Sequence, residues 1–292
     1  MGMYTIRNQE LVIKVHSFGA ELKSLKARST GREYLWQADP AYWKRTSPVL
    51  FPLVGNYINK EMHYRGKSYT MSQHGFARDR EFTCIRQEEK EIWFRLEADE
   101  ETKKSYPFAF VLEIGYELTE SRTVKVTWKV TNQDDKEMYF SIGGDPAFYC
   151  PLNPGEKQTD YSIYLEGAKE ITSRRIGEGG LATDTLVTYP LEESCLPIDA
   201  HLFDYDALVV ENHQTQKVSL LDPGKHPYVT VSFDAPLFGL WSPPKKNAPF
   251  VCIEPWYGRC DHEKFEGTLE EREWGNRLSP GEVFEAFYTI SI

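Results

Sequence analysis

The stretch that decides the fold class is Leu112–Val130, LEIGYELTESRTVKVTWKV. Its last eight residues, TVKVTWKV, place valine or tryptophan at every even position and threonine or lysine at every odd one. Its first seven residues, LEIGYEL, also carry an apolar side chain at every second position. Such alternation is typical of a strand with one buried face. Because four residues, Thr119–Arg122, separate the two runs, the stretch predicts a hairpin of antiparallel strands.

The same pattern recurs along the chain, whereas helical patterning is scarce. Asp99–Ser105 is expected to form one short helical turn, ended by Pro107. Nothing resembles the alternation of strands and helices that produces a parallel sheet. We therefore expect an all-β fold of closed or stacked antiparallel sheets, in one domain over residues 1–292. Further strands are predicted at Leu11–Val15, Ile92–Leu96, Leu208–Glu211, Val218–Leu221, Tyr228–Phe233 and Phe284–Ile292.

Turn residues separate these runs. Tyr64–Lys67, with the sequence YRGK, is expected to be a tight turn, and Gly177–Gly180, with the sequence GEGG, a surface loop. No repeat, low-complexity tract or linker divides the chain, which supports the expectation of a single domain.

The composition excludes some classes of function. Lysine and arginine number 34 and aspartate and glutamate 44, giving a net charge of −10. Nucleic-acid binding is therefore not expected, because phosphate contacts need a basic face. Aromatic residues make up 14% of the chain. Most of them suit a β-rich core, but some are expected to line a sugar site, where flat rings stack on sugar faces.

The five cysteines do not form a recognisable framework. Their number is odd and their spacing wide, so no disulfide or structural zinc pattern is predicted, including around Cys252, Cys260 and His262. The first residues contain no apolar signal segment, and no 18-residue apolar stretch occurs. We therefore expect a reduced, cytoplasmic protein that is not bound to a membrane.

Several catalytic signatures are missing, and four polar islands stand out instead. The chain lacks GxSxG, P-loop, HExxH and GxGxxG motifs, so hydride and phosphoryl transfer are poorly supported. Each island joins an ionisable group to glycine, proline or aromatic residues, and each could also be purely structural. Glu254 is the hardest to explain structurally, because it follows the apolar run Phe250–Ile253 and burying an ionised glutamate is costly. The islands are Gln73–Arg78, Gly143–Phe148, Asp204–Asp206 and Ile253–Arg259.

Four segments together resemble the aldose 1-epimerase (galactose mutarotase-like) superfamily, in its LacX-like branch. They are RTSPVLFPLVG at 45–55, QHGFAR at 73–78, IGGDPAF at 142–148 and CIEPWYGRCD at 252–261. They occur in the family's order and span most of the chain. The resemblance implies a large antiparallel β-sandwich, the galactose mutarotase-like supersandwich. It also implies a sugar-binding cleft open to solvent.

The resemblance further implies a reaction, the interconversion of the α and β anomers of an aldose. A base removes the proton of the C1 hydroxyl while an acid protonates the ring oxygen, so the ring opens and can close on the other face. No metal or organic cofactor is needed. Glu254 matches the general base, and His74 matches a residue that polarises the ring oxygen. The predicted substrate-binding residues are Arg45, Asn56, Arg78, Asp206 and Trp256.

Two positions depart from the family pattern. Asn56 stands where many relatives carry a sugar-contacting arginine. Asp145 stands where the family has the histidine that serves as general acid. A free aspartate has a pKa of about 3.9 and holds almost no proton at neutral pH. Asp145 could act as the acid only if burial and the neighbouring Glu254 carboxylate raised its pKa by several units.

Three functions remain open from the sequence. The first is an active mutarotase with Glu254, His74 and Asp145 as catalytic residues. The second is a non-catalytic sugar-binding or sensing protein, with Asp145 as the mark of lost acid catalysis. The third is another carbohydrate enzyme that uses two carboxylates. The expected partner is a small-molecule sugar, bound by a monomer or homodimer. A phosphorylated sugar would need several arginines to converge at the cleft, and the candidates are Arg45, Arg78, Arg259 and Arg272.

Overall fold

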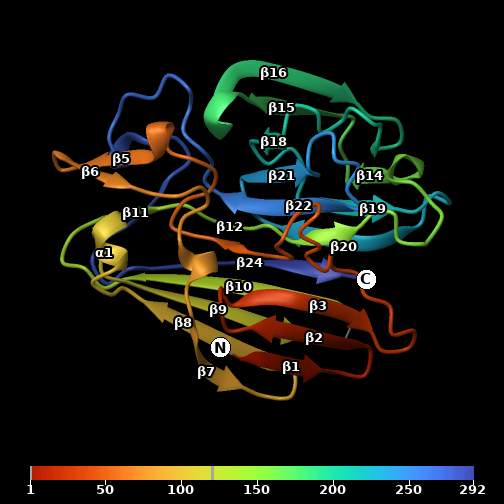
Figure 1. Ribbon diagram of the computed structural model, residues 1–292, viewed down its shortest axis with the longest axis horizontal. Coiled ribbons are helices and arrows are strands. Elements are labelled where there is room, and N and C mark those ends of the chain that lie inside the picture. The colour runs from red at the N-terminus through yellow and green to blue at the C-terminus, as the bar shows by residue number, and fades with distance from the viewer. Residues whose placement is uncertain (1, 120–121) are drawn as a thin grey trace.

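Two large antiparallel sheets form the body of the molecule (Figure 1). The structure is a computed structural model that describes residues 2–119 and 122–292. In Figure 1, β15, β16 and β18 of one sheet lie at the top of the view, and β7 to β10 of the other lie at the bottom. The predicted all-β antiparallel sandwich is thereby confirmed.

The nine-stranded sheet contains the hairpin that the sequence predicted. Strands β9 and β10 pair antiparallel, with Leu118 opposite Val124. Within the predicted connection, residues 120 and 121 lie outside the described part of the chain. In sheet order the strands are β17 (Cys195–Pro197), β14 (Ser162–Leu165), β19 (Lys217–Leu221), β20 (Pro227–Phe233), β24 (Val283–Ser291), β10 (Thr123–Asn132), β9 (Phe110–Leu118), β8 (Glu91–Glu97) and β7 (Thr83–Gln87).

The eight-stranded sheet carries two of the four polar islands, Gly143–Phe148 and Ile253–Arg259. Its central strand, β22, is buried along seven of its eight residues, because neighbouring strands flank it and side chains pack on both of its faces. In sheet order the strands are β16 (Ala182–Pro190), β15 (Glu170–Ile176), β18 (Leu208–Glu211), β21 (Leu237–Trp241), β22 (Phe250–Tyr257), β12 (Ile142–Gly144) and β4 (Val49–Leu50), with β13 (Ala147–Tyr149) also paired to β22.

Smaller elements complete the described chain. The turn predicted at Tyr64–Lys67 is confirmed as the link between β5 and β6, and the predicted helical turn is confirmed as α1. The remaining strands are β1 (Met3–Arg7), β2 (Leu11–His16), β3 (Glu21–Ala27), β5 (Glu61–Tyr64), β6 (Lys67–Thr70), β11 (Met138–Phe140) and β23 (Asn276–Leu278). The helices are α1 (Thr102–Ser105) and the 3-10 turns η1 (Ile58–Lys60), η2 (Ala77–Asp79), η3 (Gln158–Asp160), η4 (Glu178–Gly180) and η5 (Leu269–Glu271).

The core lies between the two large sheets. Val124, Val126, Trp128 and Val130 are fully buried, as their alternation predicted. Trp128 packs against Tyr288 of its own sheet and meets Tyr257 of the other. Fully burying a side chain of this size stabilises a fold by roughly 1.5–3 kcal/mol. The other predicted strands are confirmed in β2, β8, β18, β19, β20 and β24.

The core extends under a third layer, the sheet of β1 to β3. Its side chains belong to the same apolar cluster as those of the large sheets, and Tyr4 packs edge-on against Phe94 of β8. Across the described residues no helix is long and apolar enough to cross a membrane.

Candidate active site

A cavity of about 390 Å³ collects residues from all four polar islands. It is large enough for a small organic molecule. Strands of the eight-stranded sheet form its floor, and the loops that carry residues 73–78, 145 and 206–207 form its sides. The residues that line it are Trp43, Val54, Gly55, Gln73, His74, Arg78, Asp145, Ile176, Gly180, Asp206, Ala207, Val209, Trp241, Pro244, Glu254, Trp256 and Cys260.

Strand β22 supplies the floor of the cavity. Glu254 and Trp256 are two residues apart and therefore lie on the same side of the strand. The neighbouring strand β21 carries Gly239 opposite Glu254. A Cβ at Gly239 would lie 2.6 Å from the Trp256 ring. The glycine thus allows the indole to lie close to the sheet, where it lines the cavity beside Glu254.

Asp145 reaches the cavity from the corner between β12 and β13. Its backbone N–H donates to the Pro48 carbonyl at 3.2 Å, which anchors the corner. Asp145 is 5% exposed, and its carboxyl lies within 4.8 Å of the Glu254 carboxyl. One carboxylate oxygen, Oδ1, is buried without a hydrogen-bond partner in the described chain. Two carboxyl groups from distant segments therefore meet at the base of one cavity.

Burial decides the protonation of this pair. It raises the pKa of Asp145 to about 7, against the lowering effects of a hydrogen bond from Cys252 and the charge of Arg78. Burial also raises the pKa of Glu254 well above its usual value, and the Asp145 and Asp206 carboxylates raise it further. Two carboxyls in contact cannot both ionise cheaply, so the pair retains a proton close to neutral pH. The sequence required burial and the Glu254 carboxylate to raise the pKa of Asp145; burial does so, whereas Glu254 lowers it.

His74 lies on the other side of the cavity and is held by its backbone. It adopts a left-handed conformation with φ of 65°. Its N–H donates to the Gly55 carbonyl at 2.8 Å, and the Gly55 N–H donates to its ring Nδ1 at 3.0 Å. A Cβ on the next residue, Gly75, would collide with the Phe51 carbonyl, so the loop needs glycine there. These contacts fix the imidazole at the cavity wall.

The same contacts define the charge of His74. Burial, followed by the charges of Arg78 and Arg45, lowers the pKa of His74 well below its usual value. Because Nδ1 accepts a hydrogen bond, the hydrogen of the neutral ring is on Nε2. His74 can therefore donate a hydrogen bond to a ligand oxygen but holds no spare proton.

We expect His74 to remain a neutral Nε2–H imidazole through and below about pH 6.5, where an exposed histidine is half protonated, because protonation would bury an unpaired cation. Proton–nitrogen NMR of the imidazole should show one protonated and one unprotonated ring nitrogen over this range. The signals can be assigned by their loss in His74→Asn, since asparagine tolerates the left-handed conformation. Two protonated ring nitrogens at about pH 6 would contradict this assignment.

Arg78, Asp206 and Trp256, which the sequence predicted to bind substrate, also line the cavity. The Arg78 guanidinium donates to the Gln73 carbonyl at 2.6 Å, which orients it from within its own loop. Asp206 has a left-handed φ of 71°, and one of its carboxylate oxygens accepts the Ala207 N–H at 2.9 Å. These three side chains are in position to contact a bound molecule.

Arg45 and Asn56, also predicted to bind substrate, do not line the cavity. The Arg45 guanidinium pairs with Asp79 at 2.8 Å and donates to the Arg78 carbonyl at 3.5 Å, so it supports the loop that carries Arg78. The Asn56 side chain donates to the Gly179 carbonyl at 2.9 Å. It thereby ties the loop of η4 to the wall, where Gly180 lines the cavity. The loop predicted at Gly177–Gly180 is thus part of the candidate site.

The sequence did not identify the aromatic wall. Trp43 and Trp241 both line the cavity, and their rings meet edge-on at 5.6 Å. Composition indicated that some aromatic residues line a sugar site. It could not select these two, because nearly 200 residues separate them and many other aromatic residues fill the core.

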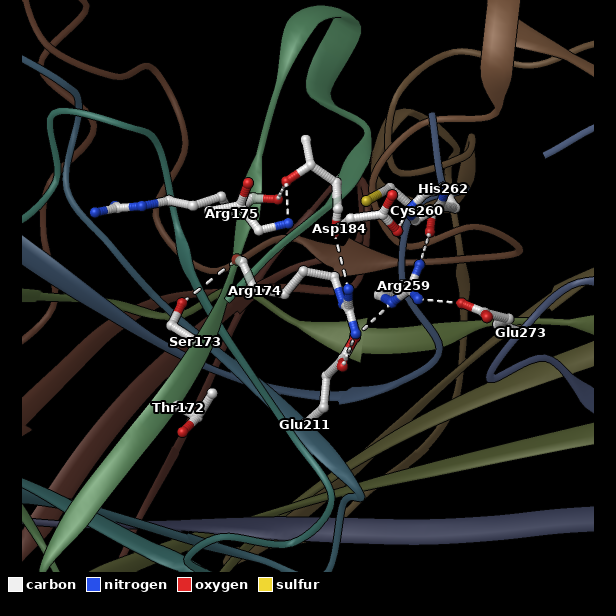
Figure 2. Close-up of polar contacts among 12 residues, drawn as sticks. Thr172, Ser173, Arg174, Arg175, Asp184, Glu211, Arg259, Cys260, His262 and Glu273 are labelled. Carbon is white, nitrogen blue, oxygen red and sulfur yellow. Dashed lines mark hydrogen bonds and ion pairs between the residues drawn. The ribbon is translucent and has the colours of Figure 1, made fainter. Parts of the chain in front are cut away.

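An ion-pair network supports the wall behind Cys260 (Figure 2). Glu211 of β18 accepts hydrogen bonds from Arg174 at 2.9 Å and from Arg259 at 2.7 Å. Burial opposes the charge of Glu211, but the two guanidinium groups hold its pKa below the usual value. Arg259 also pairs with Glu273 and donates to the Cys260 carbonyl at 2.9 Å. The network connects strands β15 and β18 to the segment after β22 and keeps these arginines out of the cavity.

One cluster in the described chain could offer several donor atoms to a metal ion. Donor atoms of Asp145, Cys252 and Glu254 all lie within 4.8 Å of one another. Burial raises the pKa of the Cys252 thiol well above its usual value, and the pKa values of both carboxyls are raised. Since ligands must be deprotonated to bind a metal, the cluster is better suited to sharing protons. The expectation that no metal or cofactor is needed stays a prediction.

Comparison with known families gives one match over nearly the whole chain. The family model described as aldose 1-epimerase matches residues 2–291. The chain is 32% identical over 296 residues to the plasmid-encoded protein LacX of Lactococcus lactis subsp. lactis, covering 98% of each chain.

Two solved structures are similar to the chain in both fold and sequence. One is a galactose mutarotase related enzyme from Lactobacillus acidophilus, with a TM-score of 0.94 and 34% identity over 99% of this chain and 97% of that one. The other is a galactose mutarotase-like protein from Lactobacillus casei, with a TM-score of 0.92 and 31% identity over 99% of each chain.

Proposed function

The chain belongs to the aldose 1-epimerase family, and from the geometry of its cavity we propose that it is an active aldose mutarotase. One observation carries the proposal. The buried carboxyls of Asp145 and Glu254 lie within 4.8 Å of each other in a cavity lined by aromatic rings and polar side chains. Burial raises the pKa of each carboxyl, so the pair can hold one proton at neutral pH. It then offers an acid and a base in adjacent positions.

The proposed reaction needs such a pair. The ionised carboxyl takes the proton of the C1 hydroxyl, and the electrons of that O–H bond form the C1 carbonyl. The bond between C1 and the ring oxygen breaks, and the ring oxygen takes the proton of the other carboxyl. The aldehyde rotates about its bond to C2, and the reverse transfers close the ring on its other face. The pair regains its starting state, so no other reactant is consumed.

The rest of the cavity has positioning roles in this scheme. The neutral His74 ring donates its Nε2–H to a sugar oxygen and lowers the cost of charge developing there. Asp206 accepts hydrogen bonds from sugar hydroxyls, and Arg78 donates to them. The rings of Trp43, Trp241 and Trp256 pack against the apolar faces of the sugar.

The pair's spacing separates this reaction from glycoside hydrolysis. Glycosidases place their carboxyls on two sides of the scissile bond, roughly 5–9.5 Å apart. Donor atoms of Asp145, at the corner between β12 and β13, and of Glu254 on β22 instead lie within 4.8 Å of each other. Both carboxyls can therefore reach two oxygens of one carbon, which mutarotation requires, whereas the wider separations of glycosidases leave room for a glycosidic bond between the carboxyls.

Mutarotation can be tested with freshly dissolved α-galactose and α-glucose, followed by polarimetry and by NMR of the anomeric protons. Acceleration over buffer supports the proposal. Saturable binding without acceleration would favour the alternative, a sugar-binding or sensing protein in which Asp145 has lost acid catalysis. If the protein neither binds these two sugars nor accelerates their mutarotation, both functions are contradicted for these sugars.

We further expect a neutral aldose to be preferred over its 6-phosphate by at least about 10-fold in kcat/KM, since like charges placed together oppose binding. Three carboxyl groups line the cavity, and within the described chain Arg78 is the one arginine or lysine that does. Arg259 and Arg272 are held in buried ion pairs with Glu211 and Asp261. The measurement compares galactose with galactose 6-phosphate. Equal efficiency would show that a cation reaches the phosphate.

A further inference from the structure

The loop between β15 and β16 forms part of the cavity wall, and its tip contains two consecutive glycines. The loop carries the turn η4, and the two strands that it connects lie at the top of Figure 1. The Gly177 N–H donates to the Leu181 carbonyl at 2.8 Å and closes the base of the loop. At the tip, Gly179 and Gly180 have left-handed φ values of 71° and 70°. Because glycine populates many other conformations, this tip depends on contacts from outside the loop.

Asn56 supplies the contact that holds the tip. Its side-chain amide donates to the Gly179 carbonyl at 2.9 Å, and among the described residues this is the one side-chain hydrogen bond that reaches residues 178–180. A Cβ at Gly180 would lie 2.7 Å from the same amide nitrogen, so the backbone of this glycine lies directly against Asn56. Gly180 is also the residue of η4 that lines the cavity. The hydrogen bond therefore holds a segment of the cavity wall.

Asn56 is itself held in place through its backbone. Its carbonyl accepts the Asp261 N–H at 2.9 Å. The Asp261 carboxylate accepts the Ile58 N–H at 3.0 Å and pairs with the Arg272 guanidinium at 2.6 Å. The side chains of this ion pair are each 3% exposed. Since none of these contacts uses the Asn56 side chain, they remain when that side chain is replaced.

The Asn56 side chain acts on the cavity through the loop. Asn56 does not line the cavity. The groups that fix the His74 ring and backbone are the N–H and carbonyl of Gly55, which no side-chain substitution at position 56 removes. The cavity of about 390 Å³ is at the low end of the range of roughly 300–1,000 Å³ for small-molecule sites. In so small a site, a fixed wall limits the length of the sugar that can enter.

We propose that Asn56 is a positioning residue that sets the size of the accepted sugar. By holding η4 against the cavity, it makes the site select a monosaccharide over a disaccharide with the same reducing unit. The inference rests on the proposed function, because it assigns the selectivity of that site. It replaces the direct contact between Asn56 and the sugar, predicted from the sequence, with an action through the loop.

The hold on the loop can be measured without any turnover. Hydrogen–deuterium exchange with mass spectrometry follows the opening of peptides that cover residues 176–182. In Asn56→Ala their exchange should be about 2- to 10-fold faster, as expected when one neutral hydrogen bond is lost. Asn56→Asp keeps the shape of the side chain but has no N–H donor, and it should act in the same direction. Equal exchange in wild type and both variants would overturn the role of Asn56.

The selectivity can be measured with glucose and with maltose, a disaccharide whose reducing unit is glucose. In wild type, kcat/KM for glucose should exceed kcat/KM for maltose. In Asn56→Ala this preference should fall by about 2- to 10-fold through the KM values, while kcat for glucose stays within twofold. A direct contact between Asn56 and the sugar would raise KM for both sugars equally and leave the exchange of the loop unchanged. That result would overturn the proposal.

Gly180→Ala approaches the same contact from the loop. Its new Cβ would collide with the Asn56 amide, so the loop should move away and both measurements should change as in Asn56→Ala. Because the two substitutions break one contact, the double variant should not exceed the larger single effect, and additive effects would contradict a shared contact. Gly31→Ala is the matched control. Gly31 has a φ of 69° and no atom within 4 Å of an added Cβ, so it adds the same backbone strain and should alter neither measurement.

The outcomes separate this inference from the proposed function. If the wild-type protein accelerates no mutarotation, the proposed function fails. Loop exchange and the calorimetric binding of glucose and maltose then still test the hold on the loop and the size selection. If circular dichroism shows that Asn56→Ala is unfolded, Gly180→Ala and its control Gly31→Ala supply the test. Unchanged exchange and unchanged selectivity in folded Gly180→Ala would overturn the inference.

Discussion

Replacing Glu254 with glutamine should slow the interconversion of galactose anomers by about 100-fold or more, the usual effect of losing an acid or base. The amide keeps the shape of the side chain but can neither give nor take a proton at these pH values. The loss is expected whichever carboxyl holds the shared proton, because the reaction needs both partners. The rate should be measured by NMR exchange of the anomeric protons at saturating sugar.

Glu100→Gln is the matched control for this substitution. The Glu100 side chain is 92% exposed and pairs only with Lys103 among the contacts of the described chain. It should leave the rate unchanged. Circular dichroism should confirm that both variants are folded. A folded Glu254→Gln variant within twofold of wild type would remove Glu254 from the chemistry.

Asp145→Asn should cost a similar factor of about 100 and should also change the shape of the pH profile. In wild type the rate should fall at low pH, where both carboxyls are protonated and no base remains. It should also fall at high pH, where the pair has lost its last proton and no acid remains. The pKa of about 7 at Asp145 places one of these transitions near neutrality. With asparagine at this position only Glu254 of the pair titrates. The residual rate should therefore fall on one side of the pH range and not on both.

Asp135→Asn, at an exposed position, is the control, and its rate should still fall at both low and high pH. The measurement is kcat as a function of pH for the three proteins. A wild-type rate that stays flat from mildly acid to alkaline pH would show that the carboxyl pair does not limit the reaction.

The sequence predicted those strands of the fold that have one buried face. In β10 alternate side chains are buried, so the alternation in the sequence reports the fold directly. Strand β22 has no such signal, because it is buried on both faces and its sequence reads as an apolar run broken by a glutamate. The short strands β4, β12 and β13 were not predicted. Two or three residues are too few to show an alternation of apolar and polar side chains, and these strands pair with partners far along the chain.

The candidate site was predictable where a residue type conflicts with its surroundings. Glu254 after an apolar run and His74 before a glycine both proved to line the cavity. The sequence could not predict that Arg45 and Asn56 bind other partners. Asp79 and Gly179 come close to them only in the folded chain. The raised pKa of Asp145 was likewise unreadable, because it depends on burial against a strand more than 100 residues away.

The pairing of β13 with β22 has a consequence for the order in which the protein assembles. Asp145 and Glu254 become neighbours only after this pairing closes a loop of more than 100 residues. Contacts of such sequence separation carry a large entropy cost and tend to form slowly. Secondary structure and the β9–β10 hairpin can form without them. Mutarotase activity should therefore return only after β13 has paired with β22. After dilution from denaturant, its recovery should lag behind the recovery of secondary structure measured by far-ultraviolet circular dichroism.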